Sequence, residues 1–352
     1  MTGVHQVVAG AAPRDAITNH VLAARDVIRA MGLRSEIFAE ERHTAGELRD
    51  RIHPHEQWAG LTQPGDAAII HYSIDSPAFT HVAQAAATVA IHYHNITTPD
   101  LLWAYAPGLA QQCAEGRDRL VPLVRMASHA AADSAFNAHE LTALGMPSVS
   151  VVGILRGPGL ATPPPASHPA PAGRQRILFV GRGVSNKAQD ELILALGSLL
   201  QAGHDAELRL VGSWGGNRAF ESRCRWLAKR VAADDRVHFL GSVSDDELAI
   251  EYRDADVFAC ASRHEGYCVP IIEALHAGLP VVARAAGAVP ETTGRAGLLL
   301  DDPTPSEMAE GIAAILGGAL RDQMRAGRSE QLAIHSPEAT TERLRTFVEG
   351  LA

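Results

Sequence analysis

Two stretches of alternating apolar and amphipathic segments, separated by a proline-rich stretch, most constrain the fold of this chain. The separating stretch, RGPGLATPPPASHPAPAGR at 156–174, is dense in proline and glycine and carries no apolar periodicity. Such a composition is typical of an exposed linker between domains. The chain has 352 residues, which is long for a single hydrophobic core. The sequence therefore predicts two domains joined by a linker.

Short apolar runs of strand character alternate with helical patterns on both sides of this linker. In the first half the helical patterns include 15–31 and 131–144, and a last helical segment is expected at 336–352. Alternation of this kind predicts two α/β domains, each a doubly wound parallel sheet. The expected strands are 4–10, 35–40, 67–73, 88–93 and 149–155 in the first half, and 176–181, 206–212, 237–241, 256–262, 280–284 and 297–301 in the second.

Composition and charge exclude several classes of protein. The formal net charge is −9, which argues against a nucleic-acid partner because phosphate backbones need a basic footprint. The first residues, MTGVHQVVAGAAPRD, lack the basic and apolar regions of a signal peptide. No apolar run reaches the ~20 residues that span a bilayer. The four cysteines show no CxxC spacing, and we expect a cytoplasmic protein.

The segment EGYCVPIIE at 265–273 places two glutamates around a predicted helix start. It follows an apolar strand, so Glu265 is expected at the carboxyl end of that strand, where such sheets bind ligands. Backbone N–H groups at the helix start form an anion site, and the carboxylate of Glu273 can accept hydrogen bonds from a vicinal diol. A simpler interpretation is that Glu273 only favours the positive helix end. An anion, a diol and further hydroxyls together describe a nucleotide sugar.

A second segment, LFVGRGVSNKAQD at 178–190, supplies two cations in the loop after the first strand of the second half. Arg182 and Lys187 flank this loop and can face a diphosphate. A dinucleotide-binding G-x-G-x-x-G fingerprint would need glycine at 186, where the chain has Asn186. The alternative for both cations is ordinary solvated surface charge. Together with the 265–273 segment, the binding role is favoured.

The seventeen histidines raise the question of a metal site. His92 and His94, in HYH, share one face of a strand and could chelate together, but no third ligand joins them at a recognisable spacing. The DAD stretch at 254–256 has the D-x-D pattern of a metal-binding motif, but it leads directly into a buried strand. We therefore expect no metal ion and no cofactor.

These segments resemble the retaining glycosyltransferases of family four, which have the GT-B fold: two Rossmann-like doubly wound domains that face each other across a cleft. The resemblance rests on VGR…NK, LRLVG, VHFLG and the E-x7-E segment within YRDADVFACASRHEGYCVPIIEALHAGLPVVA, and it runs through GAVPETTGRAGLLLDD. It covers 176–302, and the first half fits more loosely. It implies an acceptor-binding domain at 1–160, a linker at 156–174, a donor domain at 174–334, and a C-terminal helix at 335–352 that could pack back on the first domain.

The resemblance also implies roles for individual residues. Arg182 and Lys187 would neutralise the departing diphosphate, while Glu265 would contact sugar hydroxyls near the reacting carbon. Glu273 would hold the ribose. His94, from HYHNIT, would touch the transferred sugar. Further donor contacts would come from Gly181, Gly183, Gly266, Tyr267, Cys268 and Val269, and acceptor contacts from Gly10, Asp15 and Asn19.

Two positions depart from the family pattern. Relatives carry a glycine-rich loop after the first strand, where this chain keeps only Gly10. Cys268 stands where many relatives have glycine. At a helix N-terminus this thiol is expected to have a lowered pKa and to be alkylated unless an NDP-sugar covers it.

The implied activity is a retaining, metal-independent transfer of a hexosyl group from a nucleoside-diphosphate sugar to an acceptor hydroxyl. A diol held by Glu273 favours UDP or GDP as the nucleotide. The acceptor could be a small molecule, a glycan or a lipid-linked sugar, and no membrane contact is indicated. Two alternatives stay open: a nucleotide-sugar epimerase of the same architecture, and a non-catalytic nucleotide-sugar binder.

Overall fold

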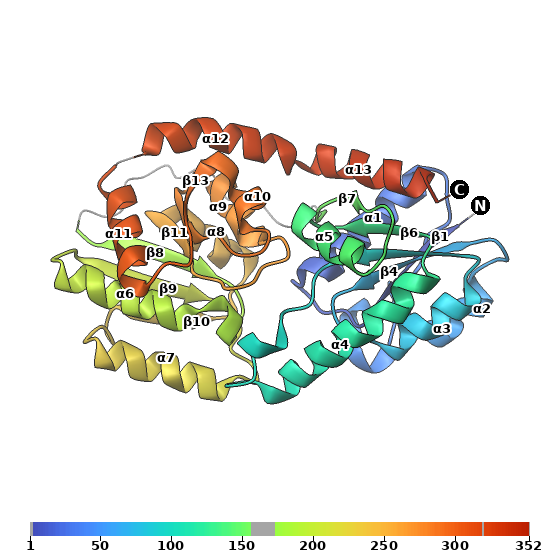
Figure 1. Ribbon diagram of the computed structural model, residues 1–352, viewed down its shortest axis with the longest axis horizontal. Helices are drawn as coiled ribbons and strands as arrows, with labels where there is room; N and C mark the ends of the chain where they lie inside the picture. The colour runs from blue at the N-terminus through green and yellow to red at the C-terminus, as the bar shows by residue number, and fades with distance from the viewer. Residues whose placement is uncertain (1–2, 156–172, 319, 352) are drawn as a thin grey trace. The chain divides into compact units, whose positions relative to one another are not determined.

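The protein consists of two compact units, which are described here separately (Figure 1). The structure is a computed structural model that describes residues 3–155, 173–318 and 320–351. Unit 1 contains Met1–Ile96, Gln111–Gly159 and His335–Ala352, and unit 2 contains Thr97–Ala110 and Leu160–Ile334. Unit 2 therefore includes a segment, Thr97–Ala110, that the division predicted from the sequence assigns to the first domain, whereas the C-terminal segment, which was expected to pack back on that domain, is part of unit 1. The predicted linker at 156–174 lies almost entirely outside the described residues.

Unit 1 is built on a parallel sheet of seven strands in the order β3-β2-β1-β4-β5-β6-β7. The reversal of strand order falls between β1 and β4, as in doubly wound folds. The central strands are buried along their length because helices cover both faces (Figure 1). The strands are β1 (Val4–Val8), β2 (Ile37–Ala39), β3 (His53–Pro54), β4 (Ala67–Tyr72), β5 (Thr88–Tyr93), β6 (His129–Ala132) and β7 (Ser150–Val151).

The helices of unit 1 include one from the end of the chain. In α13 (Pro337–Glu349), Leu344 and Phe347 are buried in one core cluster with Val4 and Ile28. The C-terminal segment therefore packs against the first strand and first helix of unit 1. The other helices with residues in this unit are α1 (Ala16–Ala30), α2 (Trp58–Leu61), α3 (Pro77–Ala85), α4 (Pro107–Met126) and α5 (Ala135–Ala143).

Unit 2 repeats the doubly wound pattern with a parallel six-stranded sheet in the order β10-β9-β8-β11-β12-β13. Its reversal falls between β8 and β11, so the loops that follow these two strands lie side by side at the ligand-binding edge. The strands are β8 (Gln175–Val180), β9 (Ala206–Val211), β10 (Val237–Gly241), β11 (Val257–Cys260), β12 (Val281–Arg284) and β13 (Gly297–Leu300).

The helices of unit 2 differ in how they begin. Two of them begin with a capping box, Ser244 with Glu247 in α8 and Thr304 with Glu307 in α11. Helix α9 instead begins after Cys268, which has left-handed backbone geometry and gives no side-chain cap. The helices are α6 (Gln189–Gln201), α7 (Arg218–Arg230), α8 (Asp245–Asp254), α9 (Val269–Ala277), α10 (Val289–Thr293), α11 (Pro305–Leu316) and α12 (Arg321–Ile334).

Side-chain contacts attach the 97–110 segment to unit 2. The rings of Tyr105 and Phe220 lie with centroids 5.2 Å apart, and Ser185 Oγ donates a hydrogen bond to the Leu101 carbonyl. A single half-buried aromatic in a short segment gives no sequence signal of this kind.

One predicted helix was wrong. The segment 131–144 was expected to be helical throughout, but it contains the end of β6, a turn, and then α5. Ser134 follows the strand and caps the helix, because its side chain accepts a hydrogen bond from the Asn137 N–H. The strand itself was missed because its residues are mainly alanines, which give no β signal. Among the described residues, no helix combines the length and apolar character needed to cross a bilayer.

Candidate functional site

An ion pair lies at the carboxyl edge of the unit 2 sheet, where β8 and β11 are neighbours. Lys187 Nζ lies 2.6 Å from Glu265 Oε1. Lys187 ends the loop after β8, and Glu265 stands in the loop after β11. The two residues predicted from separate sequence segments are thus in direct contact at the edge where doubly wound sheets bind ligands.

Backbone contacts hold both loops in place. The Arg263 N–H donates to the Asn186 carbonyl at 2.8 Å, which joins the loop after β11 to the loop after β8. The Ala288 N–H donates to the Glu265 carbonyl at 2.9 Å. Gly287 makes this approach possible, since it has a φ of +59° and a Cβ there would lie 2.3 Å from the Glu265 oxygen. The position of Glu265 is therefore fixed by backbone on two sides.

The charge of Lys187 is retained in this environment. Its side chain is only 21% exposed, and that of Glu265 is 9% exposed. Burial opposes the charged form of Lys187, but the adjacent carboxylate outweighs it, so the pKa of Lys187 is raised. A fixed positive charge stands at the carboxyl edge of the sheet.

Glu273, on the first turns of α9, is oriented by a residue that the sequence analysis did not single out. Tyr252 Oη donates to Glu273 Oε2 at 2.7 Å, and both residues are buried. Tyr252 comes from α8, so the pairing depends on two helices that are neighbours in the fold. The tyrosine belongs to the YRDAD stretch, but nothing in its spacing marks it as a partner of Glu273.

The anion site was predicted at the N-terminus of α9 (Val269–Ala277), and anion binding there stays a prediction. Cys268 has φ 65° and ψ 63°, and no side chain caps the helix, so its first N–H groups are not satisfied by a capping side chain. The Tyr267 carbonyl accepts a hydrogen bond from Thr292 Oγ1 at 2.6 Å, which fixes the residue before the turn. Gly266 and Val269, on either side, are half-buried. The turn before α9 is therefore fixed, while no side chain caps the first N–H groups of the helix.

The surroundings of Cys268 oppose the lowered thiol pKa that was expected from the helix end. A hydrogen bond with Cys260, together with burial, raises the pKa of the Cys268 thiol well above its ordinary value. The residue is also only 7% exposed. Helix-dipole stabilisation of a thiolate is therefore outweighed by burial and by the neighbouring thiol, and alkylation of Cys268 that an NDP-sugar blocks stays a prediction.

The remaining residues predicted in the loop after β8 have distinct environments. Arg182 is exposed, and its carbonyl accepts a hydrogen bond from the Gln189 side chain at 2.7 Å. Gly183 lies against Trp214, and a Cβ there would come within 2.2 Å of the indole. The Gly181 N–H donates to the Val211 carbonyl at 2.9 Å. Close packing against Trp214 therefore requires glycine at position 183.

The three residues predicted to bind the acceptor have structural roles in unit 1. A Cβ on Gly10 would lie 2.7 Å from the His43 carbonyl oxygen. Asp15 caps α1, since its side chain accepts the Thr18 N–H at 2.8 Å. The Asn19 N–H donates to the Asp15 carbonyl in the first turn of this helix. These contacts explain the three residues locally, and acceptor binding stays a prediction.

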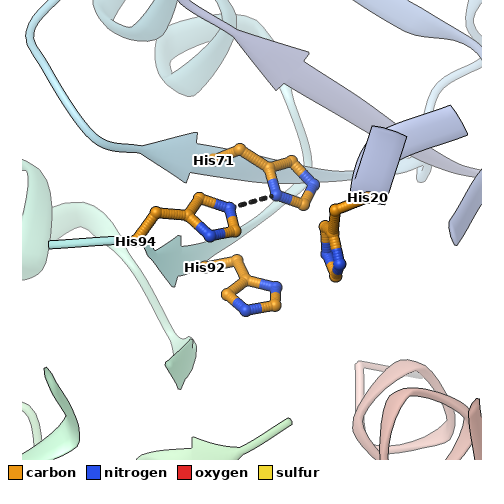
Figure 2. Close-up of side chains that lie close together, drawn as sticks. All are labelled: His20, His71, His92 and His94. Atoms are coloured by element: carbon orange, nitrogen blue, oxygen red, sulfur yellow. Dashed lines mark hydrogen bonds between the residues drawn. The ribbon is translucent and has the colours of Figure 1, made fainter. Parts of the chain in front are cut away.

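His94 lies in a buried polar cluster of unit 1 rather than alone at a strand end. Its Nδ1 is 2.9 Å from both carboxylate oxygens of Asp133, and its Nε2 is 2.9 Å from His71 Nδ1. The side chain is 1% exposed. Contact between this ring and a sugar stays a prediction. Figure 2 shows four rings gathered at one point, those of His20, His71, His92 and His94.

Burial and mutual proximity shift the titration of this cluster. Burial lowers the pKa of His20 and of His71 well below the ordinary value, and the other imidazoles add to this. For Asp133, burial acts to raise the pKa, but the imidazoles of His94 and His92 outweigh it and hold that pKa well below its usual range. Asp133 is therefore a buried carboxylate that accepts hydrogen bonds.

Solved structures that match the fold of the whole chain include a glycosyltransferase from Rickettsia africae, which aligns over 99% of this chain and 98% of its own, with a TM-score of 0.75 and 16% sequence identity. HepE from Anabaena, solved in complex with UDP-glucose, aligns over 99% of this chain and 100% of its own chain, with a TM-score of 0.75 and 18% sequence identity. At that identity the likeness establishes the fold alone. The chain has the GT-B fold, with two Rossmann-like doubly wound units.

The sequence of the second unit is similar to a defined group of enzymes. Residues 164–330 match the family model described as glycosyl transferases group 1. D-inositol 3-phosphate glycosyltransferase of Corynebacterium glutamicum is 32% identical over 144 residues, 40% of this chain and 34% of the relative. A GDP-mannose-dependent alpha-(1-6)-phosphatidylinositol monomannoside mannosyltransferase of Mycobacterium tuberculosis is 35% identical over 152 residues, 41% of this chain and 38% of the relative. The match thus spans little more than a third of each relative, and Lys187, Glu265 and Glu273 lie within the range of the family model.

Proposed function

We propose that this protein is a glycosyltransferase that moves a sugar from a nucleoside-diphosphate sugar to an acceptor hydroxyl. The observation that carries the proposal is the Lys187–Glu265 contact, 2.6 Å long, at the carboxyl edge of the unit 2 sheet. It combines a fixed cation with a carboxylate, and the helix that follows begins without a side-chain cap. The match of 164–330 to the group 1 glycosyl transferases supports this assignment.

In this proposal the donor diphosphate binds at the N-terminus of α9. The helix N–H groups and the ammonium of Lys187 stabilise the negative charge that develops when the nucleotide departs. The exposed guanidinium of Arg182 adds a second cation from the same loop. Glu273 accepts hydrogen bonds from the ribose hydroxyls, with Tyr252 fixing its other oxygen. Glu265 contacts hydroxyls of the sugar.

The proposed reaction follows the retaining course of family four. The bond between the anomeric carbon and the phosphate oxygen breaks, and a bond forms between that carbon and the acceptor oxygen on the same face. The acceptor proton passes to the leaving phosphate, so atoms and charges balance. The protein contributes positioning and charge stabilisation. Positive charge at the diphosphate comes from Lys187, Arg182 and the helix end, and we propose that transfer needs no metal ion.

The nucleotide in this proposal is UDP or GDP. A carboxylate that holds both ribose hydroxyls favours a ribonucleotide over dTDP, which lacks one of them. Both nucleotides occur among the similar proteins: the mycobacterial relative is GDP-mannose-dependent, and the structural neighbour HepE was solved with UDP-glucose. We propose that the acceptor binds to unit 1, where Gly10, Asp15 and Asn19 follow β1.

The experiment that tests this function is a turnover assay on the full chain. UDP-glucose and GDP-mannose are each incubated with the protein, with and without D-inositol 3-phosphate or another hydroxyl acceptor. The proposal predicts acceptor-dependent release of nucleoside diphosphate and a product whose anomeric configuration, read by NMR, matches the donor. A changed donor sugar without acceptor would favour an epimerase. Tight donor binding with no product across a broad acceptor panel would favour a non-catalytic binder.

A further inference from the structure

The four-histidine cluster of unit 1 is assembled by the sheet register and one helix. His71 on β4 pairs directly with His92 on β5, and His94 follows two residues later on the same side of the chain. His20 comes from α1 (Figure 2). Each of the four histidines offers one ring nitrogen, and these four nitrogens all lie within 4.8 Å of one another. All four residues are buried.

Hydrogen bonds at the outer edge of the cluster fix which ring nitrogens carry protons. The amide nitrogen of Gln6 donates to the Val21 carbonyl at 2.9 Å, so its oxygen faces His71 Nε2 at 3.0 Å and must accept. His71 Nε2 therefore carries a proton. The carboxylate of Asp133 accepts from His92 Nε2 at 3.0 Å and from His94 Nδ1 at 2.9 Å.

With one proton on each of these three rings, held by its outer partner, the inner nitrogens are lone pairs. His71 Nδ1 and His94 Nε2 lie 2.9 Å apart, a distance at which two lone pairs repel unless a positive species stands between them. His92 Nδ1 is fully buried and has no hydrogen-bond partner in the described part of the chain. Three lone pairs thus lack a donor.

A shared proton and a metal ion are the two positive species that could occupy this position. A proton would join His71 to His94 and leave His92 Nδ1 without a partner, which is costly in a buried place. A metal ion would take all three lone pairs. Each ligand ring would also donate its other N–H to a carboxylate or an amide oxygen, and this arrangement of outer partners is the one that orients metal-bound histidines in proteins.

His20 differs from the other three histidines. Its Nδ1 accepts the Leu155 N–H at 2.9 Å, so its Nε2 carries the proton, and that atom is also buried without a partner. A protonated nitrogen is no ligand, but it can donate to a water molecule bound at an open fourth position. Three imidazoles with one such position form a common zinc geometry.

We propose that unit 1 binds one divalent first-row transition metal ion, zinc in the first instance, through His71 Nδ1, His92 Nδ1 and His94 Nε2. An all-imidazole set suits zinc, cobalt, nickel or copper, whereas magnesium and calcium prefer oxygen ligands. The ion ties together the ends of β4 and β5 and, through Asp133, the end of β6. It belongs to unit 1 and takes no part in the diphosphate chemistry proposed for unit 2.

Metal titration of the full chain, expressed without a polyhistidine tag and stripped with a chelator, tests this site. Zn²⁺ affinity is measured by competition with a chromophoric chelator, and Co²⁺ is added separately for its visible spectrum. The proposal predicts about one ion per chain, a Kd below about 1 μM, and Co²⁺ bands of a four-coordinate site with three nitrogen ligands and one water. His71→Gln and His92→Gln should each abolish this binding. Asp133→Asn should weaken it by about 10- to 100-fold, because it disturbs the outer partner of two ligands.

His81→Gln is the matched control, since His81 is an exposed histidine of unit 1 outside the cluster. This variant should bind Zn²⁺ as the wild type does, and circular dichroism should show which variants remain folded. Absence of Zn²⁺ and Co²⁺ binding by the wild-type chain would overturn the proposal in favour of a buried proton. Undiminished binding in both folded ligand variants would also overturn it. If those variants fail to fold, the Co²⁺ spectrum of the wild type decides, and a six-coordinate oxygen spectrum would contradict the site.

Discussion

Lys187 Nζ and Glu265 Oε1 lie 2.6 Å apart although the residues are 78 positions apart in the sequence. The contact exists because β8 and β11 are neighbours at the reversal of the unit 2 sheet, so that the loops after them meet. The pair joins the two segments from which the function was inferred. Its contribution to the free energy of unfolding can be measured with substitutions at the two positions.

Loss of the lysine should destabilise the protein more than loss of the whole pair. In Lys187→Met the Glu265 carboxylate would remain buried without its cation, and we expect a loss of about 3 kcal/mol in the free energy of unfolding. In the double variant Lys187→Met/Glu265→Gln no unpaired charge remains, so at least about 1 kcal/mol should be recovered. Urea unfolding of both variants measures this, and equal stability of the single and double variants would contradict the coupling.

The same pair predicts a dependence of stability on alkaline pH. The pKa of Lys187 is raised above its ordinary value of 10.5, so the folded state binds the proton more tightly than the unfolded state. The stabilisation is fully present below about pH 10 and is lost as the pH rises through the folded-state pKa. The stability difference between wild type and Lys187→Met should therefore be constant from pH 7 to about 9.5 and shrink above that. A difference that grows with alkaline pH would show the opposite sign of shift.

Tyr252 should matter for nucleotide binding through Glu273. Tyr252→Phe removes the 2.7 Å hydrogen bond to the carboxylate, and we expect a loss of about 1 kcal/mol in stability together with a several-fold rise in nucleotide Kd. Tyr93→Phe is the matched control, because Tyr93 Oη donates to Glu140 at 3.0 Å in unit 1. The control should lose comparable stability and keep its nucleotide affinity. Equal affinities in the two variants, measured by calorimetry, would contradict the role given to Tyr252.

Cys268 occupies a backbone geometry that favours glycine. Its φ of 65° costs an L-residue about 1–2 kcal/mol relative to glycine. Cys268→Gly and Cys268→Ala both remove the thiol, so the difference between them isolates the backbone term. The glycine variant should be more stable by about 1 kcal/mol in thermal or urea unfolding. A more stable alanine variant would mean that the turn relaxes when the side chain changes.

The sequence predicted well those features that depend on local pattern. The apolar strands were found because burial on two faces leaves largely apolar runs, as in Ala67–Tyr72. Helix α9 was found from Pro270 at its start and from Gly278, whose φ is 80°, at its end. Strand β6 was missed because alanine carries no strand signal.

Features that depend on which strands and helices are neighbours could not be predicted from the sequence. His92 and His94 were recognised as sharing a face, but His71 joins them only because β4 and β5 pair in register, and His20 only because α1 packs over that edge. Tyr252 reaches Glu273 because α8 and α9 are neighbours. Spacing along the chain contains none of these relationships, so the cluster and the tyrosine were found only in the structure.

The central claim, that unit 2 binds a nucleoside diphosphate at Lys187, Glu273 and the α9 N-terminus without a metal ion, is tested most directly by thermal unfolding. Wild type and Glu273→Ala are unfolded in EDTA with UDP, GDP, dTDP or ADP. For a ligand at 100 times its Kd, the stabilisation is about 2.7 kcal/mol, a rise in Tm on the order of 5 °C for a unit of this size. The account predicts such a rise with UDP or GDP in wild type and its loss in Glu273→Ala. No rise with any of the four nucleotides, or an equal rise in the variant, would contradict it.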